Sequence, residues 1–292
     1  MCLKHFEYVT ARSIPEAATL MAQYAPDGLL IAGGTDLVVR LKQNLAHPKV
    51  LVDIAGISAL KGIELQDQGL RLGALTTHNE IAASSLVWQY APALATASAS
   101  VGAIQTRNLG TLGGNLVSCV PSSDTAPPLL VLGAQVILCG KGGQRRISIE
   151  DFFVAPRCSA ARNDEILVEI LIPSPNLGKP SSFEKFGRRK ALTLAIVNAA
   201  TCLDLDQTKT TFIAARIALG AVAPTPIRAY KAENFLAGKP IHESVLKEAS
   251  QIAAEETNPI DDFRASAQYR RMLTAVLTRR VLERALAGQG NR

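Results

Sequence analysis

Two glycine pairs, each with a threonine close by, are the residues of this sequence most able to do chemistry. The first lies in IAGGTDL (residues 31–37), and the second lies about 80 residues later in TLGGNL (residues 111–116). A residue without a Cβ allows positive φ and lets a ligand approach the main chain closely. Where a loop leads into a helix, unpaired backbone N–H groups suit an anion such as a diphosphate. Both segments are expected to have this layout, so together they could hold a diphosphate from two sides.

Each glycine pair could instead be an ordinary tight turn. Neither segment matches the G-x-G-x-x-G dinucleotide fingerprint or the P-loop pattern. The residues alone therefore predict a phosphate-bearing cofactor and leave its identity open.

Composition limits the classes of function. The chain has 292 residues and 48% hydrophobic content, which is ample for a core. Its longest apolar stretches are shorter than the roughly 18 residues that a membrane-spanning helix requires, so no span is expected. The first residues contain no apolar signal core, which predicts a cytoplasmic protein. The formal charge is +6 with 5% aromatic residues and one basic cluster at 185–190, a pattern that does not favour nucleic-acid binding.

The five cysteines are scattered, with no CxxC spacing. We therefore expect reduced thiols and neither a metal site nor an iron–sulfur cluster in this chain.

The first 55 residues are expected to fold as α-β-α-β. Ser13 and Glu16 form a capping box that starts a helix. Leu29–Ala32 is a short buried strand that runs directly into the first glycine pair, and Lys49–Ile54 is a second strand.

The middle of the chain begins with a hairpin over residues 62–75. A second capping box, Thr77 with Glu80, opens a helical stretch that continues to about residue 102. After the second glycine pair, a helix is expected over residues 127–134 because prolines fill its first turn. Further strands follow, and a proline-rich linker spans residues 173–180.

The remaining third predicts long strands within residues 191–206 and 210–222, then three helices at 229–238, 243–256 and 265–288. In the last helix an apolar stripe recurs at helical spacing and is expected to face the core. The stripe consists of Tyr269, Met272, Leu273 and Val276. Unlike halves with mixed strand order indicate an α+β fold.

IAGGTDL, TLGGNL, SSDTAPPLLVLGA (residues 122–134) and EKFGRRKALTLAIVNAA (residues 184–200) together resemble the flavin subunit of the xanthine dehydrogenase and carbon monoxide dehydrogenase family of molybdenum hydroxylases. The match spans nearly the whole chain. The resemblance implies a PCMH-like FAD-binding domain over residues 1–175, with subdomains at about 1–55 and 56–175. A smaller C-terminal domain with a three-stranded sheet and helices would cover residues 180–288.

The resemblance also implies a set of FAD contacts. These are Leu30, Ile31, Ala32, Gly33, Gly34, Thr35, Asp36, Val101, Thr111, Leu112, Gly113, Gly114, Asn115, Asp124, Leu167 and Lys185. Leu167 would lie against the flavin ring, and the Lys185 ammonium would stabilise negative charge on the reduced ring. Asp124 could instead cap the 127–134 helix, and Lys185 could belong to the solvated basic cluster.

By the same resemblance, FAD is bound non-covalently and this chain has no catalytic acid or base. Electrons would arrive from [2Fe–2S] clusters on a small partner subunit, after substrate oxidation at a molybdenum cofactor on a large one. They would leave to NAD, a quinone or another acceptor, and the assembly would be a dimer of heterotrimers. A stand-alone FAD-dependent oxidoreductase and a flavin-free scaffold protein remain as alternatives.

Overall fold

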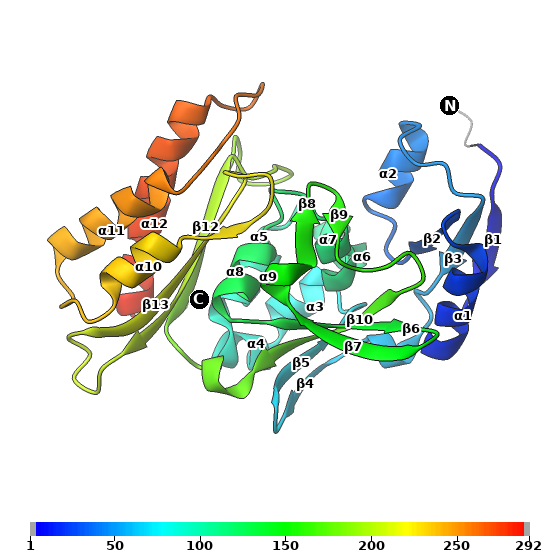
Figure 1. Cartoon of the computed structure of the whole chain (residues 1–292), viewed down its shortest axis with the longest axis horizontal. Coiled ribbons are helices and arrows are strands. Elements are labelled where there is room, and N and C mark those ends of the chain that lie inside the picture. The colour runs from blue at the N-terminus through cyan, green and yellow to red at the C-terminus, as the bar shows by residue number, and fades with distance from the viewer. Residues whose placement is uncertain (1–3, 289–292) are drawn as a thin grey trace.

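A computed structural model describes residues 4–288, and Figure 1 shows the chain running from an N-terminal part to a C-terminal part along the longest axis. Within this range, three larger sheets alternate with layers of helices, and a fourth sheet has only two short strands. Cys2 and the other terminal residues lie outside the described range.

The N-terminal part holds a parallel sheet in the order β1-β3-β2, with α1 and α2 between its strands in sequence. The bounds are β1 Glu7–Thr10, α1 Ile14–Tyr24, β2 Gly28–Ile31, α2 Leu37–Lys42 and β3 Val50–Asp53. The expected α-β-α-β order is therefore wrong at its start, because β1 precedes the first helix. This strand escapes prediction since it is short and mostly exposed, with little apolar pattern.

The second sheet is antiparallel, in the order β4-β5-β10-β6-β7. Its strands are β4 Ile63–Gln66, β5 Gly69–Gly73, β6 Gln135–Gly140, β7 Gly143–Ser148 and β10 Ile166–Pro173. The central strand β10 is almost wholly apolar because both of its faces are covered. A β-bulge between Leu167 and Glu169 shifts the alternation by one residue.

Short helices cover one face of this sheet. They are α3 His78–Ala83, α4 Ser85–Tyr90, α5 Pro92–Ser100, α6 Ile104–Leu109, α7 Leu112–Val117, α8 Ala126–Val131 and α9 Ile149–Phe152. The smaller elements nearby are η1 Ser58–Leu60, β8 Phe153–Ala155, β9 Cys158–Ser159 and η2 Ser174–Asn176. The helical stretch expected from Thr77 to about residue 102 is divided into α3, α4 and α5. Ser84 caps α4, and Pro92 starts α5.

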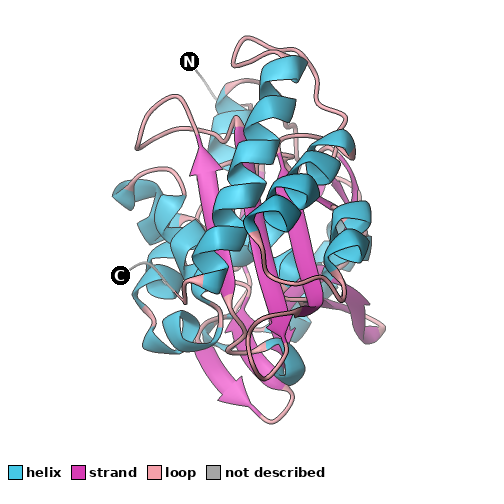
Figure 2. Cartoon of the chain, turned by 90° about the vertical axis from the view of Figure 1, so that its left-hand side faces the viewer, coloured by secondary structure: helices cyan, strands magenta, loops and turns pink. Residues whose placement is uncertain are grey.

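The C-terminal part holds the third sheet, antiparallel in the order β11-β12-β13-β14. The bounds are β11 Ser181–Phe186, β12 Val197–Leu205, β13 Phe212–Gly220 and β14 Ile227–Arg228. The two-residue strand β14 makes this sheet larger than the expected three strands. Figure 2 shows helices packed across the outer face of the sheet, namely α10 Tyr230–Leu236, α11 Glu243–Glu255 and α12 Ala267–Leu286.

Strand β12 is buried on both faces, and the alternation of its side chains divides them between two cores. Ala200 and Cys202 point to the core that also contains helices α5 and α8 and the second sheet. Val197 and Leu203 point to the core beneath α10–α12. One face of the third sheet therefore completes the core of the N-terminal part.

The stripe expected on the last helix does not face the core. Only Leu273 is buried, whereas Tyr269, Met272 and Val276 are exposed. The buried face of α12 instead carries the hydroxyls of Thr274 and Thr278 beside its apolar residues. The helical period was correct, but the side of the helix that packs was not.

Arg270, at the start of α12, is a buried cation whose hydrogen bonds connect α12 to three other segments of the C-terminal part. Its Nη1 donates to the carbonyls of Ile196 (2.6 Å) and Ala221 (3.0 Å), and its Nη2 donates to Asp262 Oδ1 at 2.7 Å. Charged hydrogen bonds of this kind offset the cost of burying the guanidinium only while every partner is present.

We expect Arg270→Met to lower the free energy of unfolding by about 3–5 kcal/mol, because two carbonyls and a carboxylate lose their donor. The measurement is urea unfolding followed by circular dichroism. Arg271→Met is the matched control, since Arg271 is exposed on the same helix. Equal stability of the two variants would contradict this role for Arg270.

Candidate cofactor-binding site

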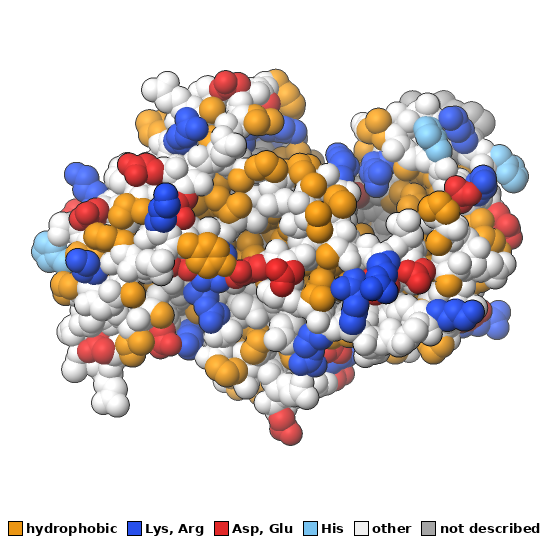
Figure 3. All heavy atoms as spheres, in the orientation of Figure 1, with side chains coloured by type: hydrophobic (Ala, Val, Ile, Leu, Met, Phe, Trp, Pro, Cys, Tyr) orange, Lys and Arg blue, Asp and Glu red, His pale blue; other side chains and the backbone are white. Residues whose placement is uncertain are grey.

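The segments that carry the two glycine pairs, far apart in sequence, meet in space. A Cβ built on Gly33 would lie 1.7 Å from the carbonyl oxygen of Leu109, so only glycine allows this approach. Gly34 has φ of +68°, which also favours glycine. The contact joins the end of β2 to the segment that precedes α7. In Figure 3 hydrophobic side chains gather in the hollow between the lobe that carries α2 and the C-terminal part.

Polar side chains extend the contact between the loops. Asp36 Oδ2 lies 2.8 Å from the hydroxyl of Ser118, at the end of α7. On the other side of α7, Asn115 Oδ1 accepts hydrogen bonds from Ser123 and Thr125, each at 2.6 Å. These two residues flank Asp124, so the second loop is bonded both to the first loop and to the Asp124 segment.

The first loop offers free backbone donors. Within residues 4–288, the amides of residues 33–37 donate to no acceptor, while Val38 N begins the helical pattern by donating to Gly34 O at 3.0 Å. Consecutive unpaired N–H groups of this kind suit an anion. The first loop therefore has the unpaired amides that its sequence predicts, and the binding of a diphosphate there stays a prediction.

The second loop does not share this property. Its amides already have partners: Leu112 N donates to Thr76 O (2.9 Å), and Gly113 N donates to Ala74 O (2.8 Å). Gly114 N donates to the Thr111 hydroxyl at 3.1 Å. The expectation that both loops present free amides is therefore wrong for residues 112–114. Their role is close packing, since a Cβ on Gly113 would meet Ala74 at 2.8 Å.

Asp124 and Lys185 form a buried ion pair that joins the N-terminal and C-terminal parts. Lys185 Nζ lies 2.6 Å from Asp124 Oδ2, and both side chains are 8% exposed. The ammonium also donates to the carbonyls of Ser100 (2.6 Å) and Thr193 (3.4 Å), so all three of its hydrogens have acceptors. Asn198 Nδ2 donates to Asp124 Oδ1 at 3.0 Å. Burial raises the pKa of the Asp124 carboxyl, and the Lys185 charge and the two hydrogen bonds oppose that rise.

This geometry decides between the alternatives left open by the sequence. Thr125, not Asp124, is the N-cap of α8, so the capping role for Asp124 is wrong. The side chain of Lys185 is buried, so it does not belong to the solvated cluster that the exposed Arg188 and Arg189 form. The two residues are instead partners of each other.

Other expected positions fall around this arrangement. Leu30 and Ile31 belong to β2, which leads through Ala32 into the first loop. Val101 follows α5, and its carbonyl accepts from Arg107 Nη1 at 3.0 Å. Leu167 is 5% exposed in the same core cluster as Leu112, below the second loop.

His78 and Arg107 were not expected at this site. The His78 amide donates to Gly110 O at 3.0 Å, and its ring carbon Cδ2 lies 3.3 Å from where a Cβ on Gly110 would be. The ring is 2% exposed, and its Nδ1 has no hydrogen-bond partner within residues 4–288. Burial lowers the His78 pKa to about 4, and the charge of Arg107 adds to this effect. The only sequence signal was that His78 follows the capping residue Thr77.

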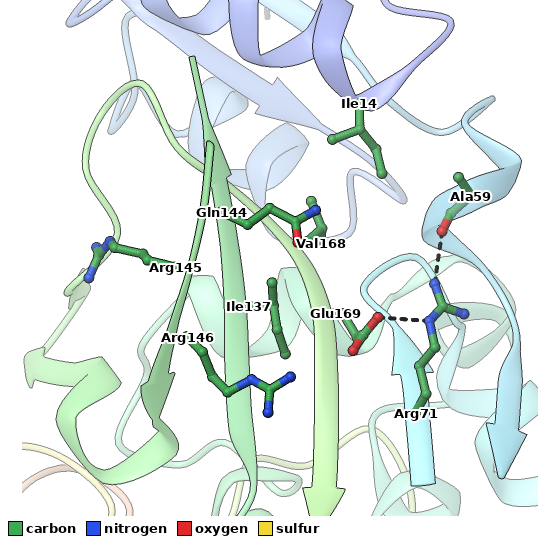
Figure 4. Close-up of a pocket in the computed structure, with 9 residues that line it drawn as sticks. All are labelled: Ile14, Ala59, Arg71, Ile137, Gln144, Arg145, Arg146, Val168 and Glu169. Atoms are coloured by element: carbon green, nitrogen blue, oxygen red, sulfur yellow. Dashed lines mark hydrogen bonds and ion pairs between the residues drawn. The ribbon is translucent and has the colours of Figure 1, made fainter. Parts of the chain in front are cut away.

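A separate cleft of about 390 Å³ lies on the opposite face of the second sheet, beside Ile14 of α1. Figure 4 shows Ile137 and Val168 in this cleft together with arginines. Two of these arginines are ion-paired: Arg71 with Glu169 at 2.8 Å, and Arg145 with Glu165, outside the lining, at 2.7 Å. The cleft contains no residue of either glycine loop.

Two negative findings apply to residues 4–288. Within that range, no cluster of three or more His, Cys, Asp or Glu residues could hold a metal ion. Over the same range, no helix combines the length and apolar character needed to cross a membrane.

Comparison with known proteins identifies the class. Residues 4–175 match the family model of the FAD binding domain in molybdopterin dehydrogenase, and residues 181–285 match the CO dehydrogenase flavoprotein C-terminal domain. The chain belongs to this family of FAD-binding subunits of molybdenum hydroxylase complexes, whose members are components of oxidoreductases.

Individual relatives support the assignment along the full length. The chain is 31% identical to the xanthine dehydrogenase FAD-binding subunit of Escherichia coli O157:H7, covering 98% of this chain and 97% of that protein. It is 32% identical to the carbon monoxide dehydrogenase medium chain of Afipia carboxidovorans, with 98% of each covered. Among solved structures, carbon monoxide dehydrogenase from Hydrogenophaga pseudoflava matches with a TM-score of 0.94 and 31% identity, over 98% of this chain and 99% of that one.

We expect Gly33→Ala to separate the first loop from the end of α6, because its methyl group would overlap the Leu109 carbonyl. Overpacking of this kind costs about 2–3 kcal/mol, measurable by urea unfolding. Gly56→Ala is the control, since a Cβ there meets nothing within 4 Å. If the two variants were equally stable, the loop contact would not need glycine.

His78 should make the fold sensitive to acid. An unfolded histidine gains a proton below pH about 6.5, whereas folded His78 stays neutral down to about 4, so stability falls as pH drops between these values. The expected loss approaches about 1.4 kcal/mol per pH unit once the unfolded histidine is protonated, which amounts to about 1.6 kcal/mol from pH 6.5 to 5. Urea unfolding of wild type and His78→Gln at both pH values tests this. Between pH 6.5 and pH 5 the free energy of unfolding of His78→Gln should fall less than that of wild type, by the amount given above. His5→Gln, at an exposed site, should behave as wild type.

Proposed function

We propose that this chain passes electrons from [2Fe–2S] clusters on a partner subunit, through non-covalently bound FAD, to an external acceptor such as NAD or a quinone. The bound cofactor would supply the redox chemistry. The observation that carries the proposal is the run of five unpaired amides at residues 33–37, held against the end of α6 by the contact between Gly33 and Leu109.

The residues of the first loop fit FAD because unpaired amides suit its diphosphate. Gly33 packs against the Leu109 carbonyl and Gly34 has positive φ, and together they hold the loop in the conformation that leaves those amides unpaired. Thr111–Asn115 belong to the same set of proposed contacts. The remaining contacts that we propose are Leu30, Ile31, Ala32, Thr35, Asp36, Val101, Asp124, Leu167 and Lys185.

Lys185 has a defined part in this proposal. Because its three donors are satisfied, its ammonium is fixed in place. It holds Asp124 on one side and the carbonyl before Val101 on the other. We propose that it orients these groups toward the flavin, and that its charge is shared with Asp124.

The substrate specificity of the complex would be determined by a partner subunit and not by this chain. This chain is 31% identical to a xanthine dehydrogenase subunit, 32% to a carbon monoxide dehydrogenase chain and 30% to a caffeine dehydrogenase subunit. This chain is about equally similar to subunits of enzymes that act on very different substrates, which supports an electron-transfer role that is common to these subunits. We propose a large molybdenum-cofactor subunit and a small [2Fe–2S] subunit as partners, in a dimer of heterotrimers.

We further propose residues 1–175 and 180–288 as the two domains and the cytoplasm as the location. Free thiols at Cys119, Cys139, Cys158 and Cys202 support a reducing compartment.

The test is native purification of the tagged full chain from its host. We expect FAD that acid precipitation releases, two co-purifying chains, and bound molybdenum and iron by elemental analysis. A lone chain that carries flavin and oxidises a substrate by itself would contradict the subunit role. A well-folded assembly without flavin would contradict the cofactor site.

A further inference from the structure

Arg107, on α6, is a cation with most of its hydrogen-bonding capacity unused. Its guanidinium donates once, to Val101 O at 3.0 Å, although arginine has five N–H donors. Within residues 4–288 it forms no ion pair. By contrast, the partly buried Arg71, Arg145 and Arg228 each have a carboxylate within 3 Å.

The position of Arg107 relates it to both glycine loops. It lies one turn before Gly110 in the chain, and its charge lowers the pKa of His78, whose ring packs against Gly110. Gly110 is also close to the first loop, because the Thr35 hydroxyl lies 3.4 Å from where its Cβ would be. Arg107 is also two residues before Leu109, whose carbonyl contacts Gly33 at the start of the run of free amides.

The other basic groups near the loops, Lys185 and His78, do not provide a free positive charge for a diphosphate. A diphosphate carries negative charge that backbone amides stabilise only with partial charges. Lys185 is neutralised by Asp124 at 2.6 Å. His78 is buried and stays uncharged at neutral pH, so it does not supply a charge. Asp36, the acidic residue of the first loop, is held by Ser118.

We propose that Arg107 is the cationic ligand of the FAD diphosphate, binding its oxygens together with the free amides of residues 33–37. The inference rests on the proposed function, since it assumes that FAD lies between the two loops. A planar guanidinium with free N–H groups can bind two phosphate oxygens at once, which an amide cannot do. The hydrogen bond to Val101 O would fix the orientation of the guanidinium.

The experiment compares FAD release from purified wild type, Arg107→Gln and Arg107→Lys, as assembled in the host. Dilution releases flavin, whose fluorescence gives the dissociation constant. Arg107→Gln should weaken FAD binding by about 10- to 100-fold, as expected for lost charged hydrogen bonds. Arg107→Lys should restore part of the affinity, because it keeps the charge without the fork.

Salt dependence separates a charge contact from a structural effect. The wild-type dissociation constant should rise with ionic strength, and the rise should be smaller for Arg107→Gln. Arg271→Gln, which removes the same charge from an exposed position on α12, should match wild type in both affinity and salt response.

The possible outcomes are distinct. Wild type without flavin would overturn the proposed function itself. Wild-type flavin with unchanged affinity in Arg107→Gln would overturn this inference alone. Equal losses in the Gln and Lys variants, with a wild-type salt response, would show that Arg107 acts by packing against Val101 and would also overturn it.

Discussion

The contact between Gly33 and the Leu109 carbonyl is the constraint on which the site depends. The loop after β2 and the end of α6 approach so closely that a single methyl group would not fit between them. Within residues 4–288 the amides of residues 33–37 have no acceptor, because the main chain at this point pairs with no neighbouring strand. The tightest packing contact of the loop therefore lies beside the donors that we propose bind the cofactor.

A second set of interactions fixes the C-terminal part relative to this contact. The Asp124–Lys185 pair is buried, and such pairs are weak sources of net stability but strong determinants of geometry once formed. Asn115 bonds the residues on either side of Asp124, so the second glycine loop is connected to β11 through two hydrogen-bonding steps. The site is therefore a continuous hydrogen-bonded network. The second loop fixes the Asp124 segment and β11 relative to the first loop, and the first loop provides the free donors.

Sequence reasoning succeeds here where the physics is local. The capping box of Thr77 and Glu80 is present, because both partners lie within one turn. The similar Ser13 signal also starts a helix, but Glu16 accepts from the amide of Arg12 instead of Ser13. The glycine loops and their separation identify the family because two rare segments must occur together.

The features that sequence could not reveal are long-range. Whether the Gly113 amide is free depends on Ala74, which a distant hairpin supplies. The partner of Lys185 lies 61 residues away. On α12, helical spacing identifies an apolar stripe, but the third sheet determines which face of the helix is buried. That face includes the buried Thr274 and Thr278. Arg107 could not be predicted as a site residue, because nothing in the sequence marks a single arginine in a short helix. Its position relative to His78 and Gly110 is known only from the structure.

The burial of β12 on both faces has a mechanical consequence. Its sheet is at once the inner layer of the C-terminal part and a wall of the core beneath α5 and α8. Domains that share a large apolar wall do not swing about a hinge, whereas domains joined by small polar contacts do. The two parts of this chain should therefore turn together as one rigid body. The proposed electron transfer would benefit from that rigidity, because a cofactor held between such parts would keep a constant distance to its electron donor and acceptor.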